Sequence, residues 1–105
     1  MRPEEKIEKE VCKYARAKGI DTVKMSIPGR RSYPDRQFLV HSGYMFFIEF
    51  KSPGERPNAQ QQIKLSELKS RGFAVFVIDN IEDGKTLVDR ELKKLAAVKR
   101  SIWQD

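Results

Sequence analysis

One apolar segment with two charges at its end limits what this chain can fold into. Residues 44–51 have the sequence Tyr-Met-Phe-Phe-Ile-Glu-Phe-Lys, and all but two of them are hydrophobic or aromatic. Such a run is typical of a buried strand, in which side chains alternate between two faces. Glu49 and Lys51 therefore share one face. Because a half-buried charge is costly unless it is paired or bound to a metal, we expect these two residues to carry chemistry.

Hydrophobic periodicity divides the rest of the chain into helices and strands. Helical spacing predicts helices over residues 4–18, 58–71 and 86–100, with Gly19 and Gly72 ending the first two. Alternating or continuous apolar residues predict strands over residues 20–27, 35–41, 44–51 and 73–79.

The order of these elements and the turns between them predict the fold class. Ser42 and Gly43 indicate a tight hairpin turn, and residues 80–84 indicate a second turn. A helix between the last two strands favours a parallel crossover. Asn58 and Gln61 have the spacing of a capping box at the start of that helix. We expect an α/β fold in which a mixed sheet is flanked by helices, in the order helix, three strands, helix, strand, helix.

Composition narrows the class of protein. The 105 residues suit one domain over residues 1–105, with 39% hydrophobic and 34% charged residues. The net charge of +6 favours a polyanionic partner, either nucleic acid or an anionic membrane. The chain has no apolar run of membrane-spanning length, and its N-terminus lacks the apolar core of a signal peptide. A single cysteine, Cys12, fits a reducing compartment, so we expect a cytoplasmic protein.

Asp35 joins Glu49 and Lys51 in a candidate catalytic set. It opens the strand that pairs with residues 44–51, so it approaches Glu49 if the pairing is in register. Two carboxylates are hard oxygen ligands that suit Mg²⁺, and the backbone carbonyl of Phe50 could add another oxygen. A metal held in this way polarises a phosphate and activates water, while Lys51 could orient that water or neutralise developing charge. The set predicts metal-assisted hydrolysis of a phosphodiester bond.

The spacing of these residues resembles a known nuclease signature. Pro34-Asp35, with Glu49-Phe50-Lys51 following fourteen residues after Asp35, is similar to the Asp…Glu-x-Lys motif of the PD-(D/E)xK superfamily. The wider context resembles a stand-alone VRR-NUC domain in these segments: Pro34-Asp35-Arg36, Ile48-Glu49-Phe50-Lys51-Ser52-Pro53-Gly54, Gln61, and Leu68-Lys69-Ser70-Arg71-Gly72. The loop before Pro34 departs from the family, which usually has a second Gly there.

This resemblance implies an αβββαβ restriction-endonuclease-like core, dependence on Mg²⁺ or Mn²⁺, and action on DNA. Small stand-alone members resemble Holliday-junction resolvases, which act as homodimers on branched DNA. By the same resemblance, Asp35 and Glu49 match the metal ligands, Lys51 matches the catalytic lysine, and Gln61 matches a site residue on the second helix. The acid of the first helix is expected to be Glu8, with Glu4 one turn earlier as the alternative.

Further residues are candidates for contact with nucleic acid. Arg30 and Arg31 precede Asp35 in a polar loop and could grip phosphates, as could Arg36, or they could be ordinary solvated charges. Tyr33 could stack on a base or simply cover the loop. A basic helix face and an apolar tail are also open to either a binding or a structural interpretation; their residues are Lys93, Lys94, Lys99 and Arg100 for the face, and Val98, Ile102 and Trp103 for the tail.

Taken together, the sequence predicts a Mg²⁺-dependent, structure-selective DNA endonuclease that acts as a homodimer on branched DNA, as in repair or recombination. No base-reading module is present in the sequence, so we expect recognition of shape rather than of sequence. Short nucleases of this kind are often phage-borne, which suggests a bacterial or phage-infected cell. The alternatives are a flap or nicking nuclease, a non-catalytic nucleic-acid-binding module with the same fold, and a subunit-interaction domain that uses the Trp103 tail.

Overall fold

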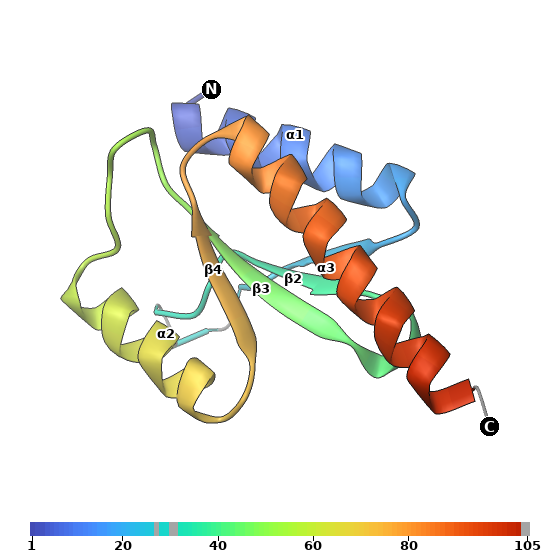
Figure 1. Ribbon diagram of the computed structural model, residues 1–105. Helices are drawn as coiled ribbons and strands as arrows, with labels where there is room; N and C mark the ends of the chain where they lie inside the picture. The colour runs from blue at the N-terminus through green and yellow to red at the C-terminus, as the bar shows by residue number, and fades with distance from the viewer. Residues whose placement is uncertain (27, 30–31, 104–105) are drawn as a thin grey trace.

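The computed structural model describes residues 1–26, 28–29 and 32–103, and it describes the side chains of the last helix as far as Lys94 (Figure 1). Arg30 and Arg31, predicted to contact nucleic acid, lie outside the described residues. So do the side chains of the predicted apolar tail. The helices are α1 (Pro3–Ala17), α2 (Ala59–Ser70) and α3 (Ile81–Trp103), and the strands are β1 (Asp21–Lys24), β2 (Arg36–Leu39), β3 (Met45–Phe50) and β4 (Ala74–Ile78).

The four strands form one mixed sheet in the order β1-β2-β3-β4. The two pairings of β2 are antiparallel, and β3 pairs with β4 in parallel. Helices α1 and α3 lie together against one face of the sheet, whereas α2 lies against the other face (Figure 1). The predicted α/β architecture, with its parallel crossover through α2, is confirmed.

Each face of the sheet has its own apolar core, as the alternation of β3 requires. On the side of α1 and α3, Phe38 and Phe46 are fully buried, and their rings stack with centroids 4.9 Å apart. On the side of α2, Phe47 and Val75 pack against Leu65 and Leu68. The second core is smaller, and Phe73 and Val77 of that face are partly exposed, at 42% and 41%.

The turn before β3 and the start of α3 differ from expectation. A short 3₁₀ turn, His41–Gly43, joins β2 to β3, with Ser42 at a φ of 67°. Helix α3 begins at Ile81, because the Asn80 side chain accepts a hydrogen bond of 2.8 Å from the backbone N–H of Asp83 and caps the helix. The prediction of a turn over residues 80–84 and a helix from residue 86 is therefore wrong.

Gly84 has a packing role inside α3. A Cβ atom at this position would lie 2.4 Å from Cγ2 of Val11, which is fully buried on α1. A contact that short is not tolerated unless the Val11 side chain or one of the helices moves. The glycine that resembled a turn residue is instead a point of close packing between α3 and α1. Among the described residues, no helix combines the length and the apolarity needed to cross a membrane.

We expect Gly84→Ala to destabilise the protein, although alanine favours helix by about 1 kcal/mol over glycine. The added methyl group overpacks the α1–α3 contact, which typically costs about 1–3 kcal/mol. Thermal unfolding of the variant measures the loss. The double variant Gly84→Ala/Val11→Ala should lose less stability than the sum of the two single changes, since the second change makes room for the first. Additive losses would show that the two residues do not share this contact.

Candidate active site

The register of β2 and β3 places Asp35 opposite Glu49. Arg36 pairs with Ile48 in the ladder, so the residue before Arg36 meets the residue after Ile48. The backbone N–H of Phe50 donates a hydrogen bond of 2.8 Å to Oδ2 of Asp35. The expected approach of the two carboxylates across the hairpin is present, and it lies at the end of β3.

Three elements supply the side chains around Glu49. Its carboxylate is 3% exposed, and it lies on the α2 side of the sheet. The ammonium of Lys51, two residues further along the same face, is 3.5 Å from Oε2 of Glu49. Nε2 of Gln61, from the first turn of α2, donates a hydrogen bond of 3.1 Å to that same oxygen. The structure therefore brings together Asp35, Glu49, Lys51 and Gln61.

Gln61 contributes to the helix cap and to the site at the same time. Its Oε1 accepts a hydrogen bond of 3.0 Å from the backbone N–H of Asn58, and its own backbone N–H donates to Oδ1 of Asn58 at 2.8 Å. This capping box fixes which way the side-chain amide faces. With Oε1 held by the cap, Nε2 is directed at Glu49.

The two carboxylates lie in surroundings that oppose their charge. Burial, and next the charge of Asp35, raise the pKa of Glu49 to about 7, and the nearby ammonium of Lys51 only partly offsets this. Burial also raises the pKa of Asp35, against the lowering effect of the N–H of Phe50. Lys51, and for Asp35 also Lys24, offset the cost of ionisation only in part, so a cation beside the two carboxylates would relieve it further.

The donor set fits a hard divalent cation. Among the residues described, no group of three or more His, Cys, Asp or Glu side chains is placed to hold a metal. A pair of carboxylates suits Mg²⁺, because this ion keeps several waters and takes one or two protein carboxylates together with substrate phosphates. The Phe50 carbonyl, between Glu49 and Lys51 at the end of β3, stays a predicted additional ligand.

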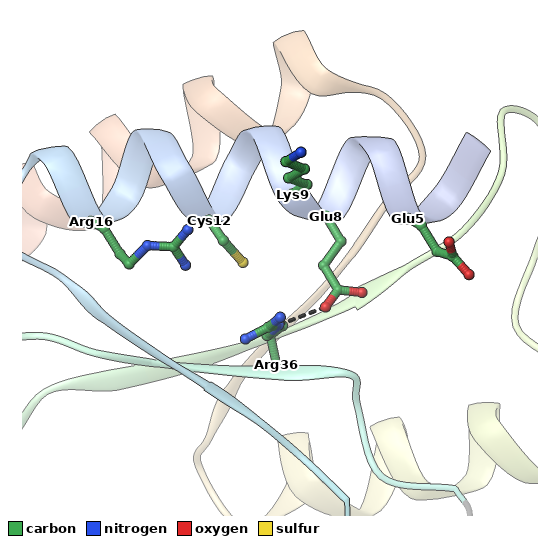
Figure 2. Close-up of a pocket in the computed structure, with 6 residues that line it drawn as sticks. All are labelled: Glu5, Glu8, Lys9, Cys12, Arg16 and Arg36. Carbon is green, nitrogen blue, oxygen red and sulfur yellow. Dashed lines mark hydrogen bonds and ion pairs between the residues drawn. The ribbon is translucent and has the colours of Figure 1, made fainter. Parts of the chain in front are cut away.

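Glu8 occupies different surroundings from this set. Its carboxylate is on the α1 side, where Oε2 is 3.0 Å from Nζ of Lys24 and 2.6 Å from Nε of Arg36. Figure 2 shows Glu8 and Arg36 pointing toward each other beneath α1, beside a pocket of about 170 Å³. Two cations already neutralise Glu8, although its charge still raises the pKa of Asp35. Among the described residues, Glu8, Asp35 and Glu49 do not form a three-acid group that could hold a metal. Its role as a metal ligand stays a prediction.

The alternative acid of the first helix, Glu4, lies nearer the end of the central strand. Its Oε2 accepts a hydrogen bond of 2.7 Å from the hydroxyl of Ser52, the residue after Lys51. Arg2 is 3.4 Å from its other oxygen. Both candidate acids of α1, Glu4 and Glu8, thus have partners within the fold.

The residues predicted to contact nucleic acid have mixed placements. Arg36 forms the ion pair with Glu8 that is described above. The ring of Tyr33 packs against the α2-side core, and the ammonium of Lys64 lies 4.6 Å from its centroid. On α3, Lys93 is exposed, whereas Lys94 is 3.0 Å from Oε2 of the buried Glu91. No local sequence pattern predicts the pairing of Lys24 with Glu8, because this pairing depends on the register of β1.

Comparison with known proteins adds one relative and one solved structure. No protein-family model matches the chain. The chain is 36% identical over 77 residues to "Putative nuclease p44" of Acyrthosiphon pisum secondary endosymbiont phage 1, covering 73% of this chain and 83% of that protein. It is also similar in structure to a VRR_NUC domain, with a TM-score of 0.79 and 24% identity over 85% of this chain and 97% of that one. The first similarity indicates common descent, and the second indicates the fold.

We expect Glu49→Gln to stabilise the metal-free protein increasingly as the pH rises. The folded pKa of about 7 lies above the ordinary value of 4.5, so the folded state holds the proton more tightly. The contribution of Glu49 to the free energy of unfolding is therefore greatest below pH 4.5. It is lost as the pH rises to about 7, by on the order of 3 kcal/mol. Glutamine does not ionise and avoids this loss. Thermal unfolding in EDTA at pH 5 and pH 8 measures the difference.

The exposed Glu55 provides the matched control for this prediction. Glu55→Gln should change the unfolding temperature equally, and only slightly, at both pH values. If Glu49→Gln gave the same small shift at pH 5 and pH 8, the buried carboxylate would not be opposed by its surroundings as described.

Proposed function

We propose that this chain, which belongs to the same family as its phage relative and has the fold of a VRR_NUC domain, is a metal-dependent endonuclease acting on branched DNA. The observation that carries the proposal is the convergence of Asp35, Glu49 and Lys51 at the end of β3. A module that only binds nucleic acid has no need of a buried and a half-buried carboxylate beside a lysine. The net charge of +6 suits a polyanionic substrate.

Asp35 and Glu49 are the proposed holders of Mg²⁺ or Mn²⁺, which when bound supplies the charge that polarises the scissile phosphate. The Phe50 carbonyl is a further proposed ligand. Glu8 can join these proposed metal ligands only if its carboxylate breaks its ion pairs with Lys24 and Arg36.

The other residues of the site act on orientation and charge. Lys51 is proposed to donate to a phosphate oxygen or to the attacking water, where its positive charge opposes the charge that develops in the transition state. Gln61 keeps Oε2 of Glu49 in one orientation, because its own amide is fixed by the helix cap. These roles require no movement of the sheet.

The choice of branched DNA and of a homodimer follows from the resemblance to junction resolvases. Two copies related by a two-fold axis would supply paired cuts across a four-way junction. The second candidate within the same chemistry is a flap or nicking nuclease, which would act as a monomer.

We expect the protein to cleave a labelled four-way junction in Mg²⁺ or Mn²⁺ and to leave it intact in EDTA. Lys51→Ala should lower kcat by about 10²–10³-fold, the usual cost of removing one stabilising donor. The exposed Lys69 on α2 provides the control, and Lys69→Ala should cleave at the parental rate. Gel analysis of junction, flap and linear duplex DNA measures all three proteins. Tight binding without cleavage in any metal would favour the non-catalytic module.

The two roles of Gln61 should separate by substitution. Gln61→Glu keeps an oxygen for the cap but replaces the donor that faces Glu49 with a second acid, so kcat should fall at least tenfold. Asn58→Ala removes the cap at a cost of about 1 kcal/mol but leaves the amide of Gln61 in place, so its main effect should be on the unfolding temperature. Cleavage rates and thermal unfolding of both variants distinguish the role of Gln61 in the site from its role in the helix cap. Equal kcat values for Gln61→Glu and the parent would leave Gln61 as a capping residue only.

A further inference from the structure

A second cavity lies beside the candidate active site, on the edge strand β4. It has a volume of about 310 Å³, and it is lined by part of the loop between β3 and α2 together with the end of β4: Gly54, Glu55, Arg56, Pro57, Val77 and Asp79. Figure 1 shows this loop arching away from the sheet before it enters α2. None of these residues has a part in the chemistry described above.

The sheet register makes this cavity a continuation of the active site. Val77 pairs with Glu49 in the parallel ladder, so the two side chains point to the same face from neighbouring strands. Adjacent strands are about 4.8 Å apart. Asp35, Glu49 and Val77 therefore form one row across three strands, with the cavity at the outer end of the row.

Val77 differs in exposure from its neighbour on the same face of β4. Val75, two residues earlier on the same face, is 3% exposed because α2 covers it, whereas Val77 is 41% exposed. Helix α2 does not extend over this end of β4. The result is an open apolar surface directly beside the buried carboxylate of Glu49.

The loop above Val77 is held by hydrogen bonds, so the cavity is formed before any ligand arrives. The backbone N–H of Gly54 donates to Oδ2 of Asp79 at 2.9 Å. The N–H of Glu55 donates to the carbonyl of Ser52 at 2.9 Å, and Nε2 of Gln62 donates to the carbonyl of Pro57 at 2.8 Å. These contacts tie the loop to β4, to its own start and to α2.

The chemistry of the lining suits a nucleobase better than a phosphate group. Glu55 and Asp79 contribute two carboxylates, and Arg56 contributes one cation. Carboxylates repel a phosphate but accept hydrogen bonds from the amino groups of bases. Val77 offers an apolar contact for the flat face of a base. The volume is at the small end of the range for ligand pockets, which fits one nucleotide rather than a longer segment.

We propose that this cavity receives the base of the nucleotide next to the scissile phosphate, and that this base must be unpaired to enter it. The inference rests on the proposed nuclease function and gives it a substrate class. A base inside a duplex must be unstacked and unpaired first, which costs a few kcal/mol, and a base at a branch point costs less. Selection of branched DNA then follows from the site of each subunit.

The test combines two changes. The cavity is filled by a substitution in the protein, and the base is removed from the DNA substrate. Cut positions are first mapped on a flap and a four-way junction, and the nucleotide on either side of the cut is then replaced by an abasic residue. For the parent protein, one of the two replacements should lower kcat/KM about tenfold, as expected for the loss of one base contact. For Val77→Trp, the intact and abasic substrates should be cleaved with equal, reduced kcat/KM.

Val23 provides the matched control, because it is an exposed valine (37%) on β1, the other edge strand of the sheet. Val23→Trp should keep the tenfold preference of the parent for the intact substrate. If thermal unfolding shows that Val77→Trp does not fold, Val77→Leu fills less of the cavity and should shift the preference in the same direction. A Val77 variant that folds and keeps the full preference would overturn the proposal, as would a parent indifferent to both abasic positions.

Binding in EDTA separates this proposal from the proposed function. Fluorescence anisotropy measures the preference without chemistry and without knowledge of the cut position, because it uses the intact DNA and a set of DNAs in which each nucleotide beside the branch point is made abasic in turn. If the parent never cleaves but still binds the intact DNA about tenfold more tightly, and Val77→Trp abolishes that difference, the nuclease function fails and the cavity assignment stands. If cleavage occurs but neither binding nor kcat/KM depends on the base, the function stands and the cavity assignment fails.

Discussion

The register of the β2–β3 ladder decides which side chains can meet at the end of the sheet. A slip of one residue would turn Asp35 to the opposite face and separate it from Glu49. The register is held by Phe38 and Phe46, which pair directly across the two strands, stack with centroids 4.9 Å apart and are fully buried. The packing of two apolar rings on one face of the sheet thus sets the position of two acids on the other face.

The two faces of the sheet carry charge in different ways. On the α1 side, the carboxylate of Glu8 is neutralised by Lys24 and Arg36. On the α2 side, the charges of the buried Glu49 and the half-buried Asp35 are countered by the ammonium of Lys51, by the charge of Lys24 acting on Asp35, and by hydrogen-bond donors from the backbone and from α2. Hydrogen bonds lower the cost of burying a carboxylate, but they do not remove the repulsion between two of them. The α2 side is therefore the face on which the proposed cation would relieve repulsion between two acids.

The helix that covers this face also restricts it. The capping box at the start of α2 sets the orientation of Gln61, and the helix leaves Val77 uncovered at the outer end of the row. The same placement of α2 therefore helps to hold Glu49 and leaves space for a ligand beside it. A longer α2, or one shifted along its axis, would close that space.

The mixed sheet and the pairing of Asp35 with Glu49 could be predicted from the sequence, because both follow from local patterns. Alternation places Glu49 and Lys51 on one face, and a hairpin brings Asp35 opposite. Features that depend on contacts between distant elements could not be predicted. Gly84 has the sequence context of a turn, yet it lies inside α3. A glycine suits this helical position because the side chain of Val11 occupies the space that a Cβ atom would need. Nothing local to Glu8 indicates that two cations from β1 and β2 will surround it.

If Asp35 and Glu49 together bind a hard divalent cation, the loss of either acid must weaken metal binding. Isothermal titration of Mn²⁺ at pH 7.5 compares the protein with Asp35→Asn and with Glu82→Gln, in which an exposed acid far from the proposed site is lost. We expect the protein and Glu82→Gln to bind Mn²⁺ with equal affinity and Asp35→Asn to bind at least tenfold more weakly. Equal binding by all three proteins would contradict this expectation.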